Sequence, residues 1–246
     1  MIDWAEWGNR FAESGDKNLR NAFVVAVALS LVLPRLPFGR NLLYPFALLS
    51  TWAHELGHGV TAVLVGGRFD RLEVHSNLNG LAYSSRVGPL GQAIVAAGGL
   101  LAPAAAGGLV IVLGSRPETA PWVLTGLAAV LVASVLLVVR NGFGWMALSA
   151  MGAGLVAIAL YAPVELRIFI AQLIGIQFAF ASWGSLNYMF TKSFIGTDGR
   201  RINSDTQNIA QVLILPYWFW GAIIALISLS IVALSFYLAW LRPVTG

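Results

Sequence analysis

Long apolar segments recur along the chain from near the N-terminus almost to its end, and they limit its fold more than any other feature. A transmembrane helix needs about 20 consecutive, mostly apolar residues. Lipid offers the backbone no hydrogen-bond partners, and helices of this length satisfy their backbone groups internally. The pattern therefore predicts an all-α integral membrane protein, a bundle of six to seven transmembrane helices, the count depending on the short first segment. The apolar segments are residues 22–34, 41–65, 89–114, 120–139, 144–162, 166–190 and 209–240.

The composition excludes a soluble globule and a disordered chain. Hydrophobic residues make up 58% of the sequence and charged residues 11%, whereas soluble domains carry about 25% charged residues and disordered chains are poor in apolar residues. No basic run with interleaved aromatic residues is present, so a nucleic-acid partner is not expected. The chain has no cysteine, which excludes disulfides, thiolate metal sites and cysteine nucleophiles.

The first twenty residues differ from the rest of the chain because they mix acidic and basic side chains. They lack the basic start, short apolar stretch and cleavage site of a secretory signal. Trp4, Trp7 and Phe11 recur at helical spacing, which predicts a short amphipathic helix at the membrane interface; a frayed polar tail is the alternative. We therefore divide the chain into an N-terminal interfacial segment, 1–20, and a single polytopic membrane domain, 21–246.

Basic residues predict an orientation, because they concentrate in the cytoplasmic loops of membrane proteins. If all seven apolar segments are spans, the loops on one side carry ten basic residues and those on the other carry five. This count predicts that the N-terminus and the two longest connections, near 66–88 and 191–208, face the cytoplasm.

The connection at residues 68–86 alternates apolar and polar residues on both sides of a Ser-Asn-Leu-Asn-Gly turn. Alternation around such a turn is typical of a β-hairpin. The pattern predicts that Leu72 and Val74 pair with Leu81 and Tyr83.

The second long apolar segment contains the sequence His54-Glu55-Leu56-Gly57-His58. Two histidines four residues apart lie on one face of a helix, so both imidazoles can reach one metal ion. Glu55 follows the first histidine and lies close to the same ion without being needed as a ligand. This arrangement suits a metal ion that activates a water molecule, with the carboxylate as general base.

A polar cluster with a purely structural role is the alternative interpretation of this motif. Its position in a membrane segment argues against that interpretation, because a charged side chain near the bilayer centre costs about 2.5–3.5 kcal/mol on insertion scales. Glu55 also lies beside two of the three histidines in the whole chain. These observations favour a functional metal site.

A catalytic zinc site of this kind needs a third protein ligand and leaves one position for water. Asp205 precedes the last apolar segment, where Asp205 or Ser204 would be the helix N-cap. Asp198 stands in a Thr-Asp-Gly turn, and we favour Asp205 over it, although capping alone would also explain Asp205. His75 is a less favoured candidate, because it belongs to the predicted hairpin.

The motif and its surroundings resemble the site-2 protease family of intramembrane zinc metallopeptidases, and more narrowly its small single-domain bacterial branch, which has no PDZ module. The likeness covers most of the chain from about residue 45 to 235, and HELGH in a membrane helix is its specific part. Residues 197–199 depart from the family pattern, reading Thr-Asp-Gly instead of Leu-Asp-Gly, and Asn187 stands where relatives of this branch carry an acid. The likeness is carried by His54-Glu55-Leu56-Gly57-His58, Gly66-Gly67-Arg68, Asn79-Gly80, Gly88-Pro89-Leu90-Gly91, Arg140-Asn141-Gly142-Phe143-Gly144-Trp145, Ser204-Asp205 and Ile214-Leu215-Pro216.

The resemblance implies hydrolysis of a peptide bond in or beside a transmembrane segment of another membrane protein. It implies one zinc ion per chain, with His54, His58 and Asp205 as ligands and Glu55 as general base. The expected partners are a transmembrane protein substrate and the lipid bilayer, and the expected location is a bacterial plasma membrane with the active site toward the cytoplasmic side. The predicted hairpin would offer an edge strand to an unwound substrate segment.

A protein of a different class is the alternative: a non-catalytic membrane protein that binds or regulates transmembrane helices, with a structural metal or none. Glu55 discriminates between the two, because a structural zinc site fills all four positions with ligands and needs no adjacent carboxylate base. A transporter would be expected to have broken helices in paired halves, and the sequence has no internal repeat of that kind. The enzyme is therefore the favoured interpretation.

Overall fold

A computed structural model describes residues 17–195 and 201–241 and shows a mainly helical chain. The predicted interfacial helix falls largely on residues 1–16, outside the described ranges, and the division into 1–20 and 21–246 stays a prediction. The strands are β1 (Arg68–Val74), β2 (Gly80–Ser85), β3 (Ser193–Ile195) and β4 (Arg201–Asn203). The helices are α2 (Lys17–Val32), η1 (Leu33–Arg35), α3 (Gly39–Leu64), α4 (Pro89–Gly114), α5 (Ala120–Leu137), α6 (Gly142–Tyr161), α7 (Val164–Gly184), α8 (Leu186–Met189), α9 (Asp205–Val212), α10 (Tyr217–Phe236) and η2 (Tyr237–Leu241).

The membrane-spanning helices confirm the predicted fold class. Within the described ranges, five helical segments are long and apolar enough to cross a membrane, and the pair α2–α3 adds a sixth if it forms one span. This pair is bent by 117° at a connection that contains Pro34 and Pro37, residues that cannot continue a helical hydrogen-bond ladder. The structure thus allows five or six spans and the sequence predicts six to seven, so six is the number on which both agree.

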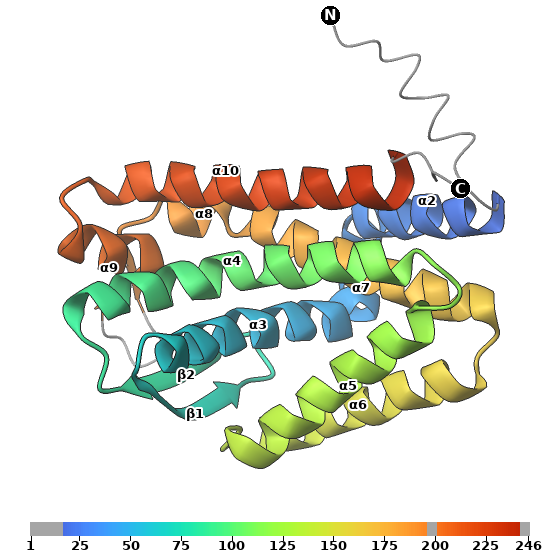
Figure 1. Ribbon diagram of the computed structural model, residues 1–246, viewed down its shortest axis with the longest axis horizontal. Helices are drawn as coiled ribbons and strands as arrows, with labels where there is room; N and C mark the ends of the chain where they lie inside the picture. Colours follow the sequence, from blue (N-terminus) through green and yellow to red (C-terminus); the bar gives the residue numbers. More distant parts are fainter. Residues whose placement is uncertain (1–16, 196–200, 242–246) are drawn as a thin grey trace, which may run out of the picture.

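Helix α4 lies at the centre of the bundle and packs against α3, α7, α9 and α10. Figure 1 shows α4 between α10 and α3, with the antiparallel α5–α6 pair on the far side of α3. The largest apolar core joins α3, α5, α6 and α7, and its buried side chains include Trp52, Leu124, Leu148 and Phe178. This core therefore connects α3 to the α5–α6 pair and to α7.

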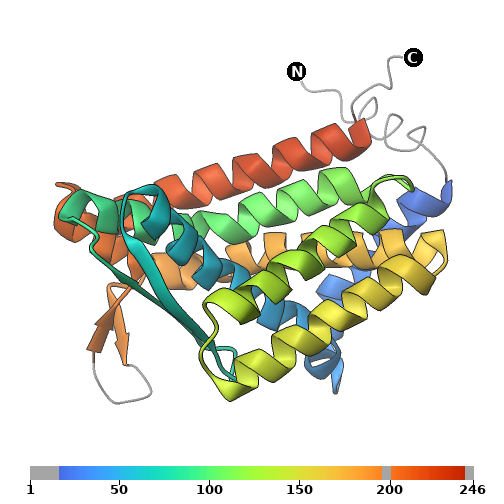
Figure 2. The same cartoon turned by 60° about the horizontal axis from the view of Figure 1, so that its bottom comes forward.

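The predicted sidedness of the N-terminal part is wrong. Figures 1 and 2 show that α2 begins at the end of the bundle opposite to the β1–β2 hairpin. The cause is the bent α2–α3 pair, which runs from one end to the other as one unit instead of crossing twice. Lys17 and Arg20 stand near the start of α2 and therefore do not belong with the hairpin loops. Two of the ten basic residues predicted for that side thus lie at the opposite end of the bundle.

The last predicted apolar segment, 209–240, is divided into two helices. The short helix α9 ends at Val212, Leu213 adopts an extended backbone, and α10 begins only after Pro216. Pro216 has no N–H to donate to a preceding turn, which explains why one helix does not run through this stretch. Asp205 consequently lies at the start of α9, not at the start of the last membrane helix.

The β1–β2 hairpin confirms the predicted one and is anchored along the outer edge of β1. Leu72 donates its N–H to the Val138 carbonyl at 2.8 Å and accepts from the Arg140 N–H at 3.0 Å. The Asn141 side chain extends this edge, donating to the Val74 carbonyl at 2.7 Å and accepting from the Val74 N–H at 3.1 Å. Figure 2 shows the hairpin reaching from the end of α3 to the connection between α5 and α6.

The predicted pairing within the hairpin is wrong by one residue. Leu72 pairs with Ala82 and Val74 with Gly80, whereas Leu81 and Tyr83 pair with Glu73 and Arg71. Directly opposed residues share a face of the sheet, so the fully buried Leu72 and Val74 lie on one face and the exposed Leu81 and Tyr83 on the other. A second, smaller hairpin of β3 and β4, which the sequence did not predict, lies in the 191–208 connection.

Candidate metal centre

Helix α3 holds His54 and His58 on one face, as their spacing predicts. Their rings are one turn apart, with centroids 4.7 Å apart and planes perpendicular. The two Nε2 atoms are 3.1 Å from each other. Both side chains therefore direct the same nitrogen to one point beside the helix.

Helix α4 fixes the orientation of His58. The His58 Nδ1 lies 2.9 Å from the Val95 carbonyl oxygen, and because a carbonyl can only accept, Nδ1 carries the proton and Nε2 is left with its lone pair. Such an outer hydrogen bond sets the tautomer of a metal-ligating histidine. Gly99 allows α4 to come this close, since a Cβ there would overlap the His58 ring.

Asp205 comes to this point from α9. Its Oδ2 lies 3.4 Å from His54 Nε2 and 3.5 Å from His58 Nε2. Ser204 is the N-cap of α9 and accepts a hydrogen bond from the Gln207 N–H at 3.2 Å. The alternative that Asp205 itself caps the helix is thereby answered: Ser204 caps it, and the Asp205 side chain turns toward the histidines.

These three side chains fit a tetrahedral cation. Bonds of 2.0–2.1 Å in tetrahedral geometry separate two ligand atoms by about 3.4 Å, and the three observed separations are 3.1, 3.4 and 3.5 Å. Burial by itself raises the pKa of the Asp205 carboxyl, but the neighbouring His58 and His54 outweigh burial, so this pKa lies below its ordinary value. Among the described residues, His54, His58 and Asp205 thus form a group that could hold a metal ion.

Glu55 lies beside this group, on the side of the β1–β2 hairpin. Its side chain is 8% exposed and interacts electrostatically with both histidines and with Asp205. The Ala82 backbone forms a hydrogen bond with its carboxylate, and a Cβ at Gly80 would come within 2.8 Å of its Oε1. Strand β2 therefore packs directly against the one acidic side chain of the HELGH motif.

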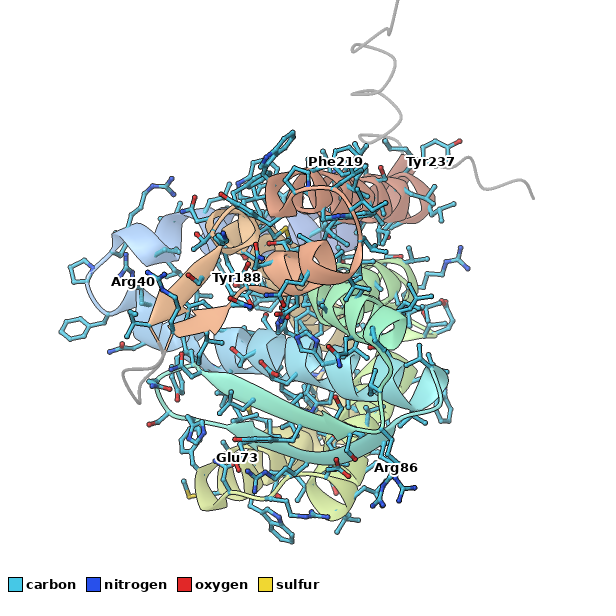
Figure 3. The ribbon with its side chains drawn as sticks, turned by 90° about the vertical axis from the view of Figure 1, so that its left-hand side faces the viewer. Arg40, Glu73, Arg86, Tyr188, Phe219 and Tyr237 are labelled. Atoms are coloured by element: carbon cyan, nitrogen blue, oxygen red, sulfur yellow. The ribbon has the colours of Figure 1, made fainter. Side chains whose placement is uncertain are left out.

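Tyr188 is a site residue that sequence reasoning missed. Its hydroxyl donates to Asp205 Oδ2 at 3.1 Å and accepts from the Asp205 N–H at 3.1 Å. Figure 3 looks onto this end of the bundle and shows Tyr188 on one side of α3, with Glu73 of the hairpin on the other. Asn187, which the sequence singled out, is exposed. No local pattern in the sequence marks Tyr188, because its contact with Asp205 depends on how α8 and α9 meet.

His75, the other candidate ligand within the described residues, does not join the group. The His75 Nε2 lies 3.6 Å from a carboxylate oxygen of Glu73, and the side chain is 42% exposed. Asp198 lies outside the described residues.

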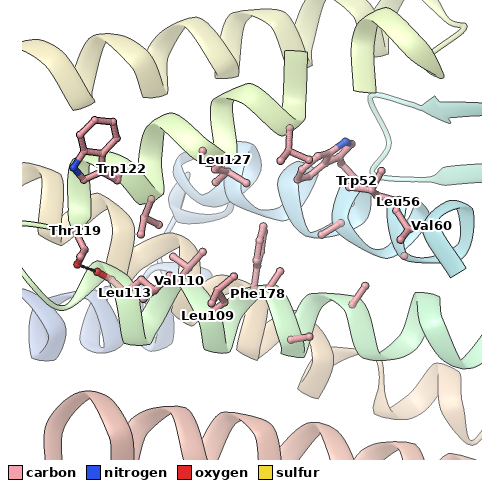
Figure 4. A pocket seen from close by; sticks show the side chains of 18 residues that line it. Trp52, Leu56, Val60, Leu109, Val110, Leu113, Thr119, Trp122, Leu127 and Phe178 are labelled. Carbon is pink, nitrogen blue, oxygen red and sulfur yellow. Dashed lines mark hydrogen bonds between the residues drawn. The ribbon is translucent and has the colours of Figure 1, made fainter. Parts of the chain in front are cut away.

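A separate cavity of about 590 Å³ lies between α3, α4 and α5 (Figure 4). Its α3 wall includes Trp52, Leu56 and Val60. A helix turns by about 100° per residue, so Leu56 points to the opposite face of α3 from His58. The wall of the cavity is almost wholly apolar, and it offers no groups for hydrolysis. The candidate metal centre is therefore distinct from this cavity.

Comparison with known proteins identifies the family of the chain. A search of curated proteins and a search of solved structures each find no match. The model of one family, described as Peptidase M50B-like, matches residues 22–235. This range includes α3, the hairpin and α9, and it covers most of the chain. The resemblance seen in the sequence is thus confirmed: the protein belongs to the Peptidase M50B-like family, within the site-2 protease family of membrane metallopeptidases.

Proposed function

We propose that the protein is an intramembrane zinc metalloprotease that hydrolyses peptide bonds in or near transmembrane segments of membrane protein substrates. The observation that carries this proposal is the convergence of three ligand atoms within 3.1–3.5 Å of one another beside the buried Glu55. A structural site would need a fourth protein ligand. A carboxylate next to a three-ligand group instead suits a site that takes a water molecule.

In this proposal His54, His58 and Asp205 hold one zinc ion per chain. Zinc, when bound, supplies Lewis acidity and lowers the pKa of water toward 7. The His58–Val95 hydrogen bond keeps the Nε2 lone pair directed at the ion. The packing of α4 against α3 keeps the two histidines in position, so that little reorganisation is needed during the reaction.

Glu55 is the proposed general base. It accepts a proton from the attacking water and returns it to the leaving amine, as a carboxylate in hydrogen-bond reach of both can do. The Ala82 backbone and the confined space beside Gly80 limit how the carboxylate can rotate. Such restriction raises the fraction of time that the base spends in a productive orientation.

Strand β2 is the proposed docking edge for the substrate. In an antiparallel ladder, some directly opposed residues exchange no backbone hydrogen bonds. Both residues of such a pair point their N–H and C=O groups away from the partner strand. Leu72 bonds outward to Val138 and Arg140, so its partner Ala82 points its backbone to the other side, toward Glu55. A transmembrane segment must unwind before its peptide carbonyls can be attacked, and an unwound segment can add to this edge as a strand.

The test is cleavage of single-span membrane proteins by the purified protein in liposomes. Wild-type protein is expected to release a product, and Glu55→Gln is expected to lose at least 100-fold in rate while retaining zinc. Glu118→Gln is the matched control, since Glu118 is exposed in the connection between α4 and α5, and it should cleave like wild type. Equal cleavage by Glu55→Gln, or zinc-loaded wild type that cuts none of a panel of such substrates, would favour the non-catalytic helix-binding protein.

A further inference from the structure

The start of α9 is joined to the segment that follows α7 by a set of short hydrogen bonds. The Ser204 hydroxyl donates to the Thr191 carbonyl at 2.5 Å, and the Ser204 N–H donates to the Lys192 carbonyl at 3.1 Å. The Thr206 hydroxyl donates to the Met189 carbonyl at 2.8 Å. Ser204 and Thr206 are completely buried, so the residues on either side of Asp205 are held in place.

Asp205 itself is held by Tyr188 in two ways. The Tyr188 hydroxyl donates to Oδ2, the oxygen that lies nearest to both histidine Nε2 atoms. The same hydroxyl accepts from the Asp205 N–H, one of the first-turn donors of α9 that has no partner within the helix. The Tyr188 ring lies against Phe194, with ring centroids 5.7 Å apart, which restricts its rotation.

These contacts give the carboxylate one orientation. At the first position of a helix, a free aspartate side chain can turn back to the N–H groups of its own first turn. Here the Ser204 hydroxyl accepts the hydrogen bond of the Gln207 N–H, and the Tyr188 hydroxyl accepts that of the Asp205 N–H. The carboxylate is therefore left free to face the histidines, and the tyrosine donor selects which oxygen does so.

We infer that Tyr188 is a positioning residue that completes the metal site by holding Asp205 toward His54 and His58. This inference rests on the proposed function, because it takes the three side chains to be metal ligands. Outer hydrogen-bond partners of metal ligands typically contribute 10–100-fold to metal affinity. Tyr188 acts through the carboxylate and makes no other contribution to zinc binding.

The test is the zinc affinity of the full-length protein, measured by competition with a chelator of known affinity. Tyr188→Phe removes the hydroxyl and keeps the ring on Phe194, and we expect zinc to bind about 10–100-fold more weakly. Tyr161→Phe is the control, because Tyr161 is exposed at the end of α6, and its zinc affinity should equal that of wild type. Unchanged affinity in Tyr188→Phe would overturn the inference.

Two further measurements separate positioning from a general effect on folding. The first uses Asp205→Ala protein and a weaker chelator. Adding Tyr188→Phe to this variant should not lower the zinc affinity further, because the carboxylate through which Tyr188 acts is absent. Thr191→Val removes a hydroxyl of the same segment that donates to the Asn187 carbonyl at 2.7 Å and makes none of the hydrogen bonds to Ser204 or Asp205 described above, so it should leave zinc affinity within threefold of wild type. Equal losses in both backgrounds, or a loss in Thr191→Val as large as in Tyr188→Phe, would also overturn it.

Cobalt absorption adds a readout that a structural role would not change. At saturating Co²⁺ the visible spectrum of Tyr188→Phe should differ from that of wild type, because the carboxylate is no longer held in one orientation. An identical spectrum together with weaker affinity would indicate that the loss arises elsewhere. If wild-type protein binds neither zinc nor cobalt, the proposed function itself is refuted. If wild-type protein binds the metal and Tyr188→Phe binds it equally well, only the inference about Tyr188 is refuted.

Discussion

Gly99 of α4 lies directly against the imidazole ring of His58, so that a Cβ at position 99 would overlap the ring and come within 2.6 Å of Cδ2. The same face of α4 brings the Val95 carbonyl oxygen to within 2.9 Å of the His58 Nδ1. One turn of α4 thus limits both where the ring can lie and which nitrogen is protonated. The candidate ligand on α3 depends on a neighbouring helix for its geometry.

Replacing Gly99 by alanine should therefore impair metal binding. The added methyl group would push the His58 ring off the line to His54 and Asp205, and we expect zinc affinity to fall at least 10-fold, comparable to the loss of an outer hydrogen bond to a metal ligand. Gly126→Ala is the control, because a Cβ there meets nothing within 4 Å. Zinc titration of both variants is the measurement, and equal affinities would show that the ring can move aside.

Gly80→Ala should impair cleavage without removing zinc. A side chain at position 80 would displace the Glu55 carboxylate, whereas His54, His58 and Asp205 would be untouched. A misplacement of about 1 Å in a catalytic group costs on the order of 100-fold in rate. Cleavage rate and zinc content are measured together, with Gly154→Ala as control, since its Cβ has open space. Loss of zinc in Gly80→Ala would mean that the hairpin supports the metal ligands themselves.

The third ligand can be identified by the zinc content of detergent-purified protein. Wild-type protein should contain about one zinc per chain, and His58→Ala and Asp205→Ala should lose it, because two remaining ligands hold zinc poorly. Asp198→Ala should retain zinc, since Asp205 already lies 3.4 and 3.5 Å from the two histidines. The reverse result for the two aspartates would assign the ligand to Asp198.

Asn141→Ala should destabilise the protein through the hairpin. The Asn141 side chain meets both backbone groups of Val74, a residue that is completely buried, and removing it leaves a donor and an acceptor unpaired. We expect the free energy of unfolding to fall by about 2 kcal/mol. Asn187→Ala, at an exposed position, should change it by less than about 0.5 kcal/mol. Denaturant unfolding in detergent is the measurement, and similar stability of the two variants would show that water replaces the lost bonds.

Local patterns were sufficient for α3 and for the existence of the hairpin. The four-residue spacing of His54 and His58 is a property of one helix, and alternation around the Asn79-Gly80 turn is a property of one segment. The register of the hairpin could not be predicted, because Leu72 and Val74 are buried in the apolar core that includes residues of α5, α6 and α7, far away in the sequence. A prediction from the hairpin alone could not know which face would be covered.

Features that depend on contacts between distant segments were missed for the same reason. The packing of α4 brings the Val95 carbonyl to His58. The way α8 and α9 meet brings the Tyr188 hydroxyl to Asp205, and the packing of α9 brings Asp205 to the two histidines. The course of the α2–α3 pair likewise depends on tertiary packing, since hydropathy alone counted two crossings. By contrast, the division of the last apolar segment at Pro216 has a local signal, which the length of that segment obscured.

The candidate ligands also differ in when they leave the ribosome. His54 and His58 are synthesised before α4, α5, α6 and α7, and Asp205 follows all four of these helices. A nascent chain therefore carries a histidine pair in its membrane-inserted part long before the carboxylate exists. If these side chains bind zinc as proposed, the ion can be held firmly only after the C-terminal third has docked. The protein would then be inert throughout its own biogenesis and could not attack neighbouring chains at the site of membrane insertion.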